Sequence, residues 1–88
     1  MVSRKVRIVN PTGLHLRPAG NLCNEAIKYE CKVLFEKDGN LANAKSVLSV
    51  LGACVKSGEE ILLMCDGEGE EEALEAIAEF IENRLGET

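Results

Sequence analysis

The spacing of hydrophobic residues switches repeatedly along this chain between a strand-like and a helix-like period. A fold for this chain must therefore combine strands and helices. In residues 2–8 apolar and polar side chains alternate except at Arg4, and in residues 31–36 every second residue is apolar (Cys31, Val33 and Phe35), which predicts half-buried strands. Residues 61–65 form a continuous apolar run, typical of a central strand covered on both faces or partly so. Residues 16–28 and 70–85 repeat apolar side chains at helical spacing, which predicts two longer helices.

Turn-forming residues separate these segments and add two shorter elements. Residues 37–40 (Lys-Asp-Gly-Asn) predict a tight turn, after which residues 41–43 return as a short strand of a hairpin. Ser46 precedes four apolar residues, Val47, Leu48, Val50 and Leu51, so its hydroxyl is placed to cap a short helix that Gly52 ends. The predicted order is βαββαβα. It favours a two-layer α+β fold, with helices on one face of a mainly antiparallel sheet.

The two longer helices carry their apolar residues in stripes. Pro18 lies near the start of the first helix, where its missing N–H costs little. The first stripe contains Leu16, Ala19, Leu22, Cys23, Ala26 and Ile27, and the last helix carries Ala73, Leu74, Ile77, Ile81 and Leu85. The chain of 88 residues is long enough for one domain and too short for two, so we expect residues 1–88 to form a single domain.

Composition and charge exclude several classes of function. Aromatic residues make up 3% of the chain and the formal net charge is −5, which argues against binding to nucleic acid. Residues 1–58 hold nine basic and four acidic residues, whereas residues 59–88 hold one and eleven. The N-terminal part therefore favours an acidic partner or an anionic ligand, and the C-terminal part predicts an exposed acidic face. No apolar run approaches the ~20 residues of a membrane span and no signal core is present, so we expect a cytoplasmic protein without membrane insertion.

The cysteines show no metal-binding pattern. They contain no C-x-x-C pair, and the single histidine, His15, is far from each of them in sequence, so we expect no metal site and no cofactor. All four lie in apolar patterns that predict buried free thiols: Cys23, Cys31, Cys54 and Cys65. A thiol-based redox or hydrolytic protein using Cys23 or Cys54 stays an alternative, and it requires an exposed thiol.

Residues 13–19 (Gly-Leu-His-Leu-Arg-Pro-Ala) are the strongest candidates for a reactive site. They place His15 between a glycine turn and the start of a helix. The positive end of the helix dipole disfavours the protonated imidazole there, and the unpaired N–H groups of the first turn form an anion site. Arg17 adds a guanidinium whose donors match phosphate oxygens. These groups suit reversible phosphoryl transfer. The alternative is a His15 that only caps or packs against the helix end, with a solvated Arg17.

Two motifs together resemble one protein family. Residues 13–19 and residues 45–48 (Lys-Ser-Val-Leu), at this spacing, closely resemble HPr, the histidine-containing phosphocarrier family of the bacterial phosphoenolpyruvate-dependent sugar phosphotransferase system. Length, element order and motif positions match over essentially the whole chain. The resemblance implies an open-faced β-sandwich with a four-stranded antiparallel sheet and three helices on one face.

The resemblance also implies a reaction. Enzyme I, phosphorylated by phosphoenolpyruvate, passes the phosphoryl group to Nδ1 of the histidine that matches His15, and the group then moves to the A domains of enzyme II. Arg17 matches the arginine that stabilises the phosphorylated and transition states. Mg²⁺ is required by enzyme I and is not held by the carrier. We therefore expect a monomeric, stoichiometric carrier rather than a turnover enzyme.

Ser46 matches a regulatory residue of the family. In some bacteria this serine is phosphorylated by an ATP-dependent HPr kinase/phosphorylase, and the product acts as a corepressor with a catabolite-control transcription regulator. An N-cap serine tolerates a phosphate well, because the dianion and the helix dipole attract each other. The alternative is an unmodified N-cap.

Docking in this family uses an apolar surface around the histidine. The residues that match it are Gly20, Asn24, Val47, Leu48 and Leu51, with Arg17 and Lys56 at the rim. In the alternative, Val50 and Leu51 point into the core. The chain departs from the common family pattern at Leu16, at Gly20 and in its four cysteines, and these differences bear on the choice of partner. A nitrogen-branch carrier or a purely regulatory paralogue that acts as a binding module stays a second hypothesis.

Overall fold

The fold is built on one antiparallel sheet. The computed structural model describes residues 1–85, and residues 86–88 of the expected domain lie outside this part. The strands pair in the order β1-β4-β2-β3, and every pair is antiparallel. Their bounds are Val2–Arg7 for β1, Lys32–Lys37 for β2, Asn40–Asn43 for β3 and Glu60–Asp66 for β4.

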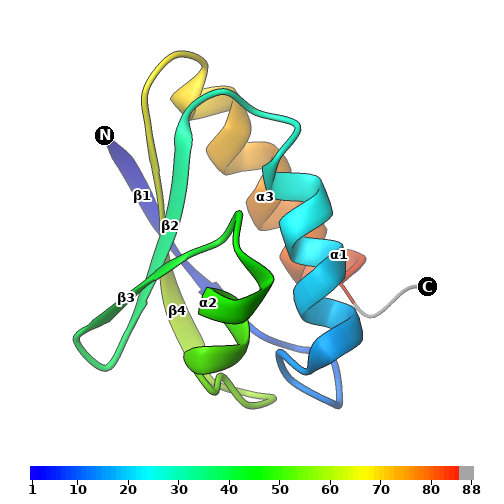
Figure 1. The fold of residues 1–88 in the computed structure, drawn as a ribbon. Helices are drawn as coiled ribbons and strands as arrows, with labels where there is room; N and C mark the ends of the chain where they lie inside the picture. The colour runs from blue at the N-terminus through cyan, green and yellow to red at the C-terminus, as the bar shows by residue number, and fades with distance from the viewer. Residues whose placement is uncertain (86–88) are drawn as a thin grey trace.

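The helices of the described residues lie on one face of this sheet (Figure 1). They are α1 (Leu16–Ala26), α2 (Val47–Gly52) and α3 (Glu70–Asn83). Helix α3 packs on β1 and β4, α2 packs beside β3, and α1 contacts both other helices. The predicted element order and the open-faced β-sandwich are confirmed.

The core lies between the sheet and the helices, where the strand alternation places it. Val33, Phe35 and Leu63 point toward the helices and are fully buried. The stripe predicted for the last helix is buried as well, although α3 ends at Asn83 rather than at residue 85. The apolar run at residues 61–65 predicted a strand covered on both faces or only partly covered. In the described structure helices cover one face of β4, so the strand is partly covered.

Helix α1 differs from the predicted pattern at its two ends. Leu16 and Ile27 are 70% and 57% exposed, because Leu16 is the first helical residue and Ile27 is the C-cap residue that follows Ala26. The helix therefore ends two residues before the predicted residue 28. Helix α2 ends at Gly52, as predicted, and Ala53 forms the C-cap.

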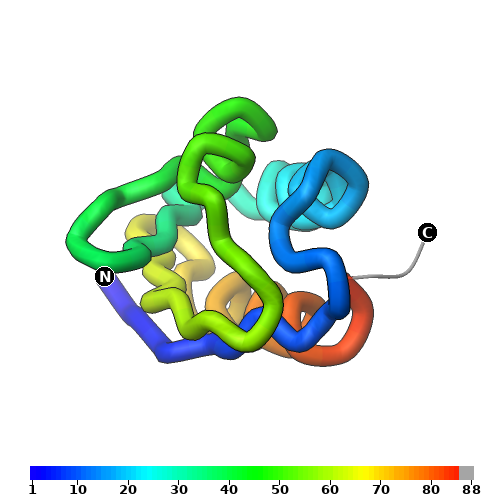
Figure 2. The backbone as a smooth tube through the Cα atoms, turned by 90° about the horizontal axis from the view of Figure 1, so that it is seen from below, coloured from blue at the N-terminus to red at the C-terminus, as the bar shows by residue number. Residues whose placement is uncertain are grey.

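Two loops meet at the end of the sheet where α1 begins, and Figure 2 shows this end of the molecule. Gly58 N–H donates to the Ile8 carbonyl (2.7 Å) and Leu14 N–H donates to the Val55 carbonyl (2.9 Å). Gly13 has a φ of +66°, in the left-handed region that glycine adopts without steric cost. The start of α1 is thereby held against the chain that runs from α2 to β4.

We expect Gly13→Ala to lower the free energy of unfolding by about 2–3 kcal/mol, as measured by urea denaturation. A Cβ at this position would lie 2.7 Å from the Val55 carbonyl oxygen and 2.9 Å from Lys56 Cα, which are backbone atoms that cannot move cheaply. The matched control is Gly20→Ala in α1, where a Cβ meets nothing within 4 Å. That change should raise stability by about 0.5–1 kcal/mol. Equal effects of the two substitutions would contradict this account of the loop contact.

Candidate functional site

His15 presents a free imidazole at the start of α1. It is the N-cap residue, with extended backbone (φ −78°, ψ −175°), and its carbonyl accepts the first helical hydrogen bond from Ala19 N–H (2.8 Å). The side chain is exposed and makes no capping hydrogen bond. The backbone of His15 therefore has a structural role that its ring does not share, and the alternative of a capping imidazole is wrong.

The first turn of α1 leaves two backbone donors beside this ring. Leu16 and Arg17 are the first two helical residues, and their N–H groups have no partner within an α-helix. The third helical residue is Pro18, which has no N–H to offer. No acidic side chain lies in the first turn, so nothing in the turn competes for these donors or repels an anion.

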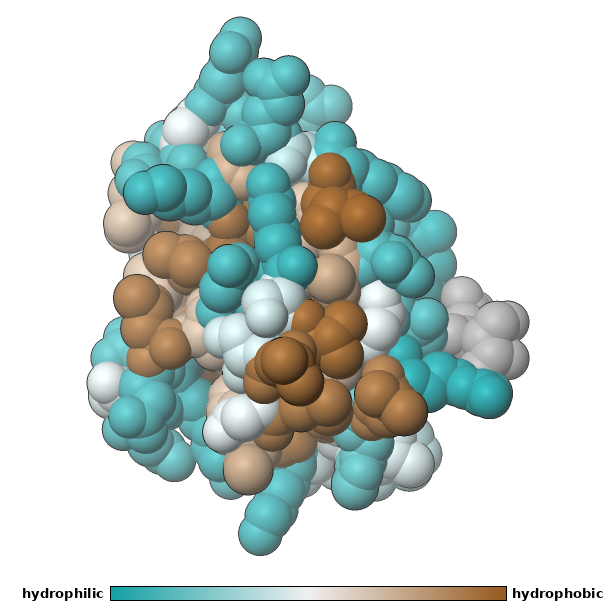
Figure 3. Space-filling view, in the orientation of Figure 1, coloured by the Kyte–Doolittle hydropathy of each residue, from teal (hydrophilic) through white to brown (hydrophobic). Residues whose placement is uncertain are grey.

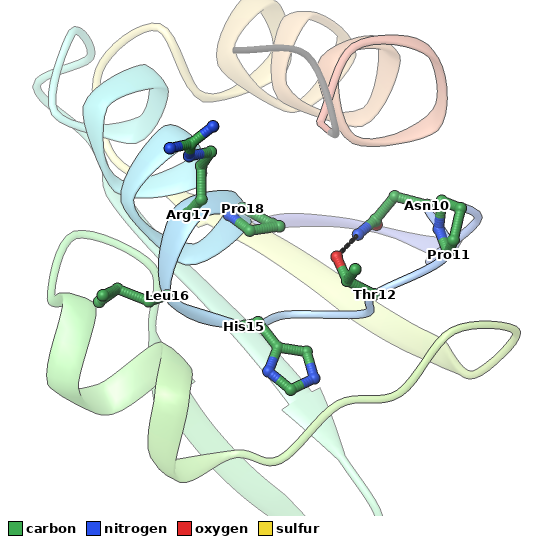
Figure 4. A pocket seen from close by; sticks show the side chains of 7 residues that line it. All are labelled: Asn10, Pro11, Thr12, His15, Leu16, Arg17 and Pro18. Atoms are coloured by element: carbon green, nitrogen blue, oxygen red, sulfur yellow. Dashed lines mark hydrogen bonds between the residues drawn. The ribbon is translucent and has the colours of Figure 1, made fainter.

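Arg17 is exposed and unrestrained. Its guanidinium forms no ion pair or hydrogen bond with any residue of the part described, 1–85. Figure 4 shows that the Arg17 and His15 side chains point to opposite sides of the start of α1. The guanidinium must therefore rotate about its side-chain bonds to reach a group bound to the ring, and no carboxylate holds it back.

Two open depressions flank His15. The larger, about 510 Å³, is drawn in Figure 4 and is lined by Asn10, Pro11, Thr12, His15, Leu16, Arg17 and Pro18. The smaller, about 240 Å³, is lined by Leu14, His15, Leu51, Cys54, Val55 and Lys56. Because His15 borders both, an approaching reagent can reach the imidazole from either side.

Asn10 supports the turn that precedes His15, although it is not among the residues predicted for the site. It is 7% exposed, and its Nδ2 donates to the Gly13 carbonyl (2.7 Å) and to Thr12 Oγ1 (3.3 Å). The signal available in the sequence was the turn-forming run at residues 10–13, where an asparagine side chain commonly bonds to nearby backbone. This bond keeps the loop in the shape that delivers His15 to the helix start.

Glu59 holds the other side of the site in place. Its carboxylate accepts from Lys56 N–H (2.6 Å) and pairs with Lys37 Nζ (3.0 Å). The hydrogen bond from Lys56, followed by that from Lys37, lowers the pKa of the Glu59 carboxyl. Lys37 Nζ also donates to the Cys54 carbonyl (3.1 Å), so one ammonium group ties together both ends of the loop beside the imidazole.

Ser46 is the N-cap of α2, as predicted. Its Oγ accepts from Ser49 N–H (3.3 Å) and its carbonyl accepts from Val50 N–H (3.0 Å). The side chain is half-buried. It directly precedes Val47 and Leu48, two residues of the expected docking surface.

The apolar residues of α2 divide between the core and the surface. Leu48 is 83% exposed, Val47 and Leu51 are half-buried, and Val50 is fully buried. Val50 therefore points into the core, as the alternative hypothesis predicted, whereas Leu51 is only partly buried and remains part of the surface. Figure 3 shows hydrophobic surface over α2 and the start of α1, with polar surface around it. We call this surface the α1–α2 patch and define it by Leu16, Val47, Leu48 and Leu51.

The other expected docking residues lie at the surface too. Asn24 and Lys56 are exposed and Gly20 is half-buried. Gly20 and Asn24 belong to α1, which packs beside α2, and Lys56 lines the smaller depression with His15. Leu16 was predicted as part of the apolar stripe of this helix and as a departure from the family pattern, and its exposure adds it to the patch.

The comparisons with known proteins agree with this geometry. The family model described as "PTS HPr component phosphorylation site" matches residues 2–83. The chain belongs to the HPr family. It is 39% identical to the HPr-like protein Crh of Bacillus subtilis over 85 residues, which cover 97% of this chain and all of that protein. It is 41% identical to the phosphocarrier protein HPr of Streptomyces coelicolor, over 99% of this chain and 95% of the relative. The crystal structure of HPr from Thermoanaerobacter tengcongensis superposes with a TM-score of 0.93 at 36% identity, covering 100% of this chain and 99% of the other.

The cysteines of this HPr-family chain fall into different environments. Cys31 and Cys65 are buried free thiols, and burial, reinforced by neighbouring Cys31, raises the pKa of Cys65 to about 12. Cys23 is half-buried, and its thiol donates to the Lys45 carbonyl (3.1 Å). The prediction that all four are buried is wrong for Cys54, which is exposed. With a φ of +53°, its backbone leaves the helical path after α2 and turns the side chain outward.

An exposed Cys54 does not by itself support the hydrolase alternative. Such an enzyme needs a thiol hydrogen-bonded to an imidazole. Cys54 and His15 border the same depression, but no hydrogen bond joins them in the described structure. Within residues 1–85, no three His, Cys, Asp or Glu side chains cluster as metal ligands would, and no helix is long and apolar enough to cross a membrane.

We expect one thiol to react rapidly with Ellman's reagent in the native protein, and Cys54→Ser should remove that fast phase. Cys65 should react only after unfolding in urea, because its raised pKa leaves almost no thiolate at pH 8 and its side chain is fully buried. Cys65→Ser serves as the control that keeps the fast phase. Rapid reaction of two or more thiols in the native state would contradict the burial described here.

Proposed function

We propose that this chain is a cytoplasmic phosphocarrier, which accepts a phosphoryl group on His15 from phosphorylated enzyme I and passes it to the A domains of enzyme II during sugar uptake. The observation that carries the proposal is the exposed imidazole at the start of α1, with no hydrogen bond to occupy its ring nitrogens in the described residues. A ring engaged in a structural hydrogen bond would have to break that bond before each transfer.

The transfer is a displacement at phosphorus. The lone pair of a His15 ring nitrogen, Nδ1 by resemblance to the family, forms the new N–P bond while the bond between phosphorus and the donor atom of enzyme I breaks. The donor atom keeps the electron pair of the broken bond. Delivery to enzyme II repeats the step in reverse, with His15 as the leaving group. Since the bond exchange needs little covalent help, positioning and charge stabilisation supply most of the catalysis.

The groups around His15 are suited to the charge on the moving phosphoryl group. The N–H groups of Leu16 and Arg17 point out of the helix start, where an anion is stabilised. The Arg17 guanidinium, free of carboxylates in the described structure, rotates toward the phosphoryl oxygens when they arrive. Because the guanidinium is flexible, Arg17 can stabilise the phosphorylated state as well as the transition states of transfer to His15 and of transfer from it.

The partners dock on the α1–α2 patch. Exposed Leu16 and Leu48 supply apolar contact, and Arg17 and Lys56 supply positive charge at the rim. Gly20 and Asn24 extend this surface along α1. A small patch with a basic rim favours fast association with acidic partners and equally fast release, as a carrier between two proteins requires.

A second candidate is a regulatory paralogue or a nitrogen-branch carrier. The similarity to the HPr-like protein Crh over nearly the whole chain favours it. A purely regulatory protein would bind its partner through the same patch without using His15 for transfer. Phosphorylation of His15 by enzyme I separates a carrier from such a binding module, and growth of a deletion strain on transported sugars separates the sugar branch from the nitrogen branch.

Regulation at Ser46 belongs to this proposal. We infer that an HPr kinase/phosphorylase transfers the γ-phosphate of ATP to Ser46 Oγ. The Oγ is a half-buried cap directly before Val47 and Leu48, so a dianion there would lie at the edge of the α1–α2 patch. It would repel an acidic partner of His15 and create a new contact for a catabolite-control transcription regulator.

Incubation with enzyme I, Mg²⁺ and phosphoenolpyruvate should produce one phosphohistidine signal in phosphorus NMR. His15→Ala should abolish this signal. Arg17→Ala should slow its appearance by about 10²–10³-fold, because a donor to the transferring group is lost. The matched control is Arg4→Ala, which removes an exposed arginine that pairs with Glu75 and Glu82 on α3. Normal labelling of His15→Ala would refute the proposed site.

Incubation with HPr kinase/phosphorylase and ATP should add one phosphate, and Ser46→Ala should remove it while costing about 1 kcal/mol of stability through the lost cap. Ser46→Asp should slow phosphorylation of His15 by enzyme I at least about tenfold, since like charges oppose docking. Ser3→Asp, an exposed position on β1 away from the patch, is the control and should leave the rate unchanged. Equal rates for both aspartate variants would contradict an effect specific to Ser46.

A further inference from the structure

Cys54 has a backbone conformation that glycine usually adopts. It follows Ala53, the C-cap residue of α2, and its φ of +53° lies in the left-handed region. Chains commonly leave a helix through this region, but glycine usually does so, because a Cβ there lies too close to a neighbouring carbonyl oxygen. A residue strained in this way keeps its conformation only where the surrounding structure holds it. The contacts around Cys54 therefore determine the path of residues 54–59, the loop beside His15.

Lys37 and Glu59 hold the two residues that flank Val55. Lys37 Nζ donates to the Cys54 carbonyl (3.1 Å), and Glu59 Oε1 accepts from Lys56 N–H (2.6 Å). An ion pair of 3.0 Å joins the two side chains, and the Lys37 side chain is only 15% exposed. We call this arrangement the Lys37–Glu59 clamp. It is anchored in the sheet, because Lys37 is the last residue of β2 and Glu59 directly precedes β4.

Val55, between the two clamped residues, makes the contact with the reactive loop. Its carbonyl accepts from Leu14 N–H (2.9 Å), and Leu14 directly precedes His15. Because peptide groups are planar, fixing the residues on both sides of Val55 fixes the direction of its carbonyl. The clamp residues line neither of the two depressions beside the imidazole. The clamp therefore acts on His15 through the backbone and not through contact with the ring.

We propose that Lys37 and Glu59 are positioning residues for phosphoryl transfer at His15. By holding Cys54 in its left-handed conformation, the clamp keeps the Val55 carbonyl directed at the loop before α1. The imidazole then stays where the N–H groups of the helix start meet it. This matters for the rate, because transfer requires the acceptor nitrogen to be aligned with the donor atom and small displacements are costly. The inference rests on the carrier function proposed above.

Lys37→Met should lower the kcat of phosphorylation by enzyme I about tenfold, because the Cys54 carbonyl loses its donor. The KM for the carrier should change by less than about twofold, since Lys37 lies outside the α1–α2 patch. Lys37→Arg should recover kcat to within about threefold, because a guanidinium keeps the charge and the donors. The matched control is Lys5→Met, an exposed lysine on β1, which should leave both constants unchanged. An unchanged kcat in Lys37→Met, a loss wholly in KM, or no recovery in Lys37→Arg would overturn the proposal.

The strained residue provides a second test. Glycine adopts the left-handed region without steric cost, so Cys54→Gly should make the loop less dependent on the clamp. In the Cys54→Gly background, Lys37→Met should therefore lower kcat by less than about threefold, against about tenfold in the wild-type background. Equal losses in the two backgrounds would overturn the link between the clamp and the conformation of Cys54.

Amide hydrogen exchange tests the clamp without enzyme I. In Lys37→Met, the Leu14 N–H should exchange at least about tenfold faster relative to the amides of β4, because the Val55 carbonyl is held less firmly. Glu59→Gln, which is nearly isosteric and removes the ion pair, should raise the same rate about threefold even if Lys37→Met does not fold. Unchanged exchange at Leu14 in the folded variants would overturn the clamp alone. A wild-type protein that enzyme I does not phosphorylate would instead refute the carrier function, and with it the kinetic role of the clamp.

Discussion

The contact between the loop before α1 and the chain that leads into β4 is the constraint on which the functional site depends. Gly13 lies so close to the backbone at residues 55–57 that only a hydrogen atom fits in place of a side chain. Leu14 N–H and the Val55 carbonyl then connect the two loops directly. Through this contact the sheet fixes where α1 begins, and with it the position of His15. A single steric requirement in a loop thus determines where the imidazole and the helix N–H groups meet.

The site combines a rigid backbone with mobile side chains, and each part has a chemical reason. The backbone of His15 is held by the Ala19 hydrogen bond and by the Asn10-supported turn, so the helix N–H groups need no reorganisation when a phosphoryl group arrives. The His15 ring and the Arg17 guanidinium carry no hydrogen bonds in the described residues, so they are free to adapt to two different partners in turn, as the proposed carrier function requires. A carrier must release what it binds, and a cation that swings in and out stabilises the charge without trapping it.

Local patterns predicted the element order, the α3 stripe and the Ser46 cap, because each depends on residues within a few positions of one another. The errors arise where distant contacts or backbone geometry decide the outcome. Cys54 lies in an apolar pattern, yet a positive φ after α2 turns it to solvent. The approach of two loops determines the burial of Asn10, and no local period reports such an approach. His15 and Arg17 were found because their motif places both at a helix start, whereas their opposite directions appear only in three dimensions.

The two faces of the sheet show how an apolar run in a sequence conceals two different uses. Ile61, Leu63 and Cys65 point toward the helices and are removed from water, so they stabilise the fold. Leu62 and Met64 come from the same run but point the other way, where no helix of the described chain covers them. Both are half-buried, so they remove less apolar area from water than Ile61, Leu63 and Cys65 do and stabilise the fold correspondingly less.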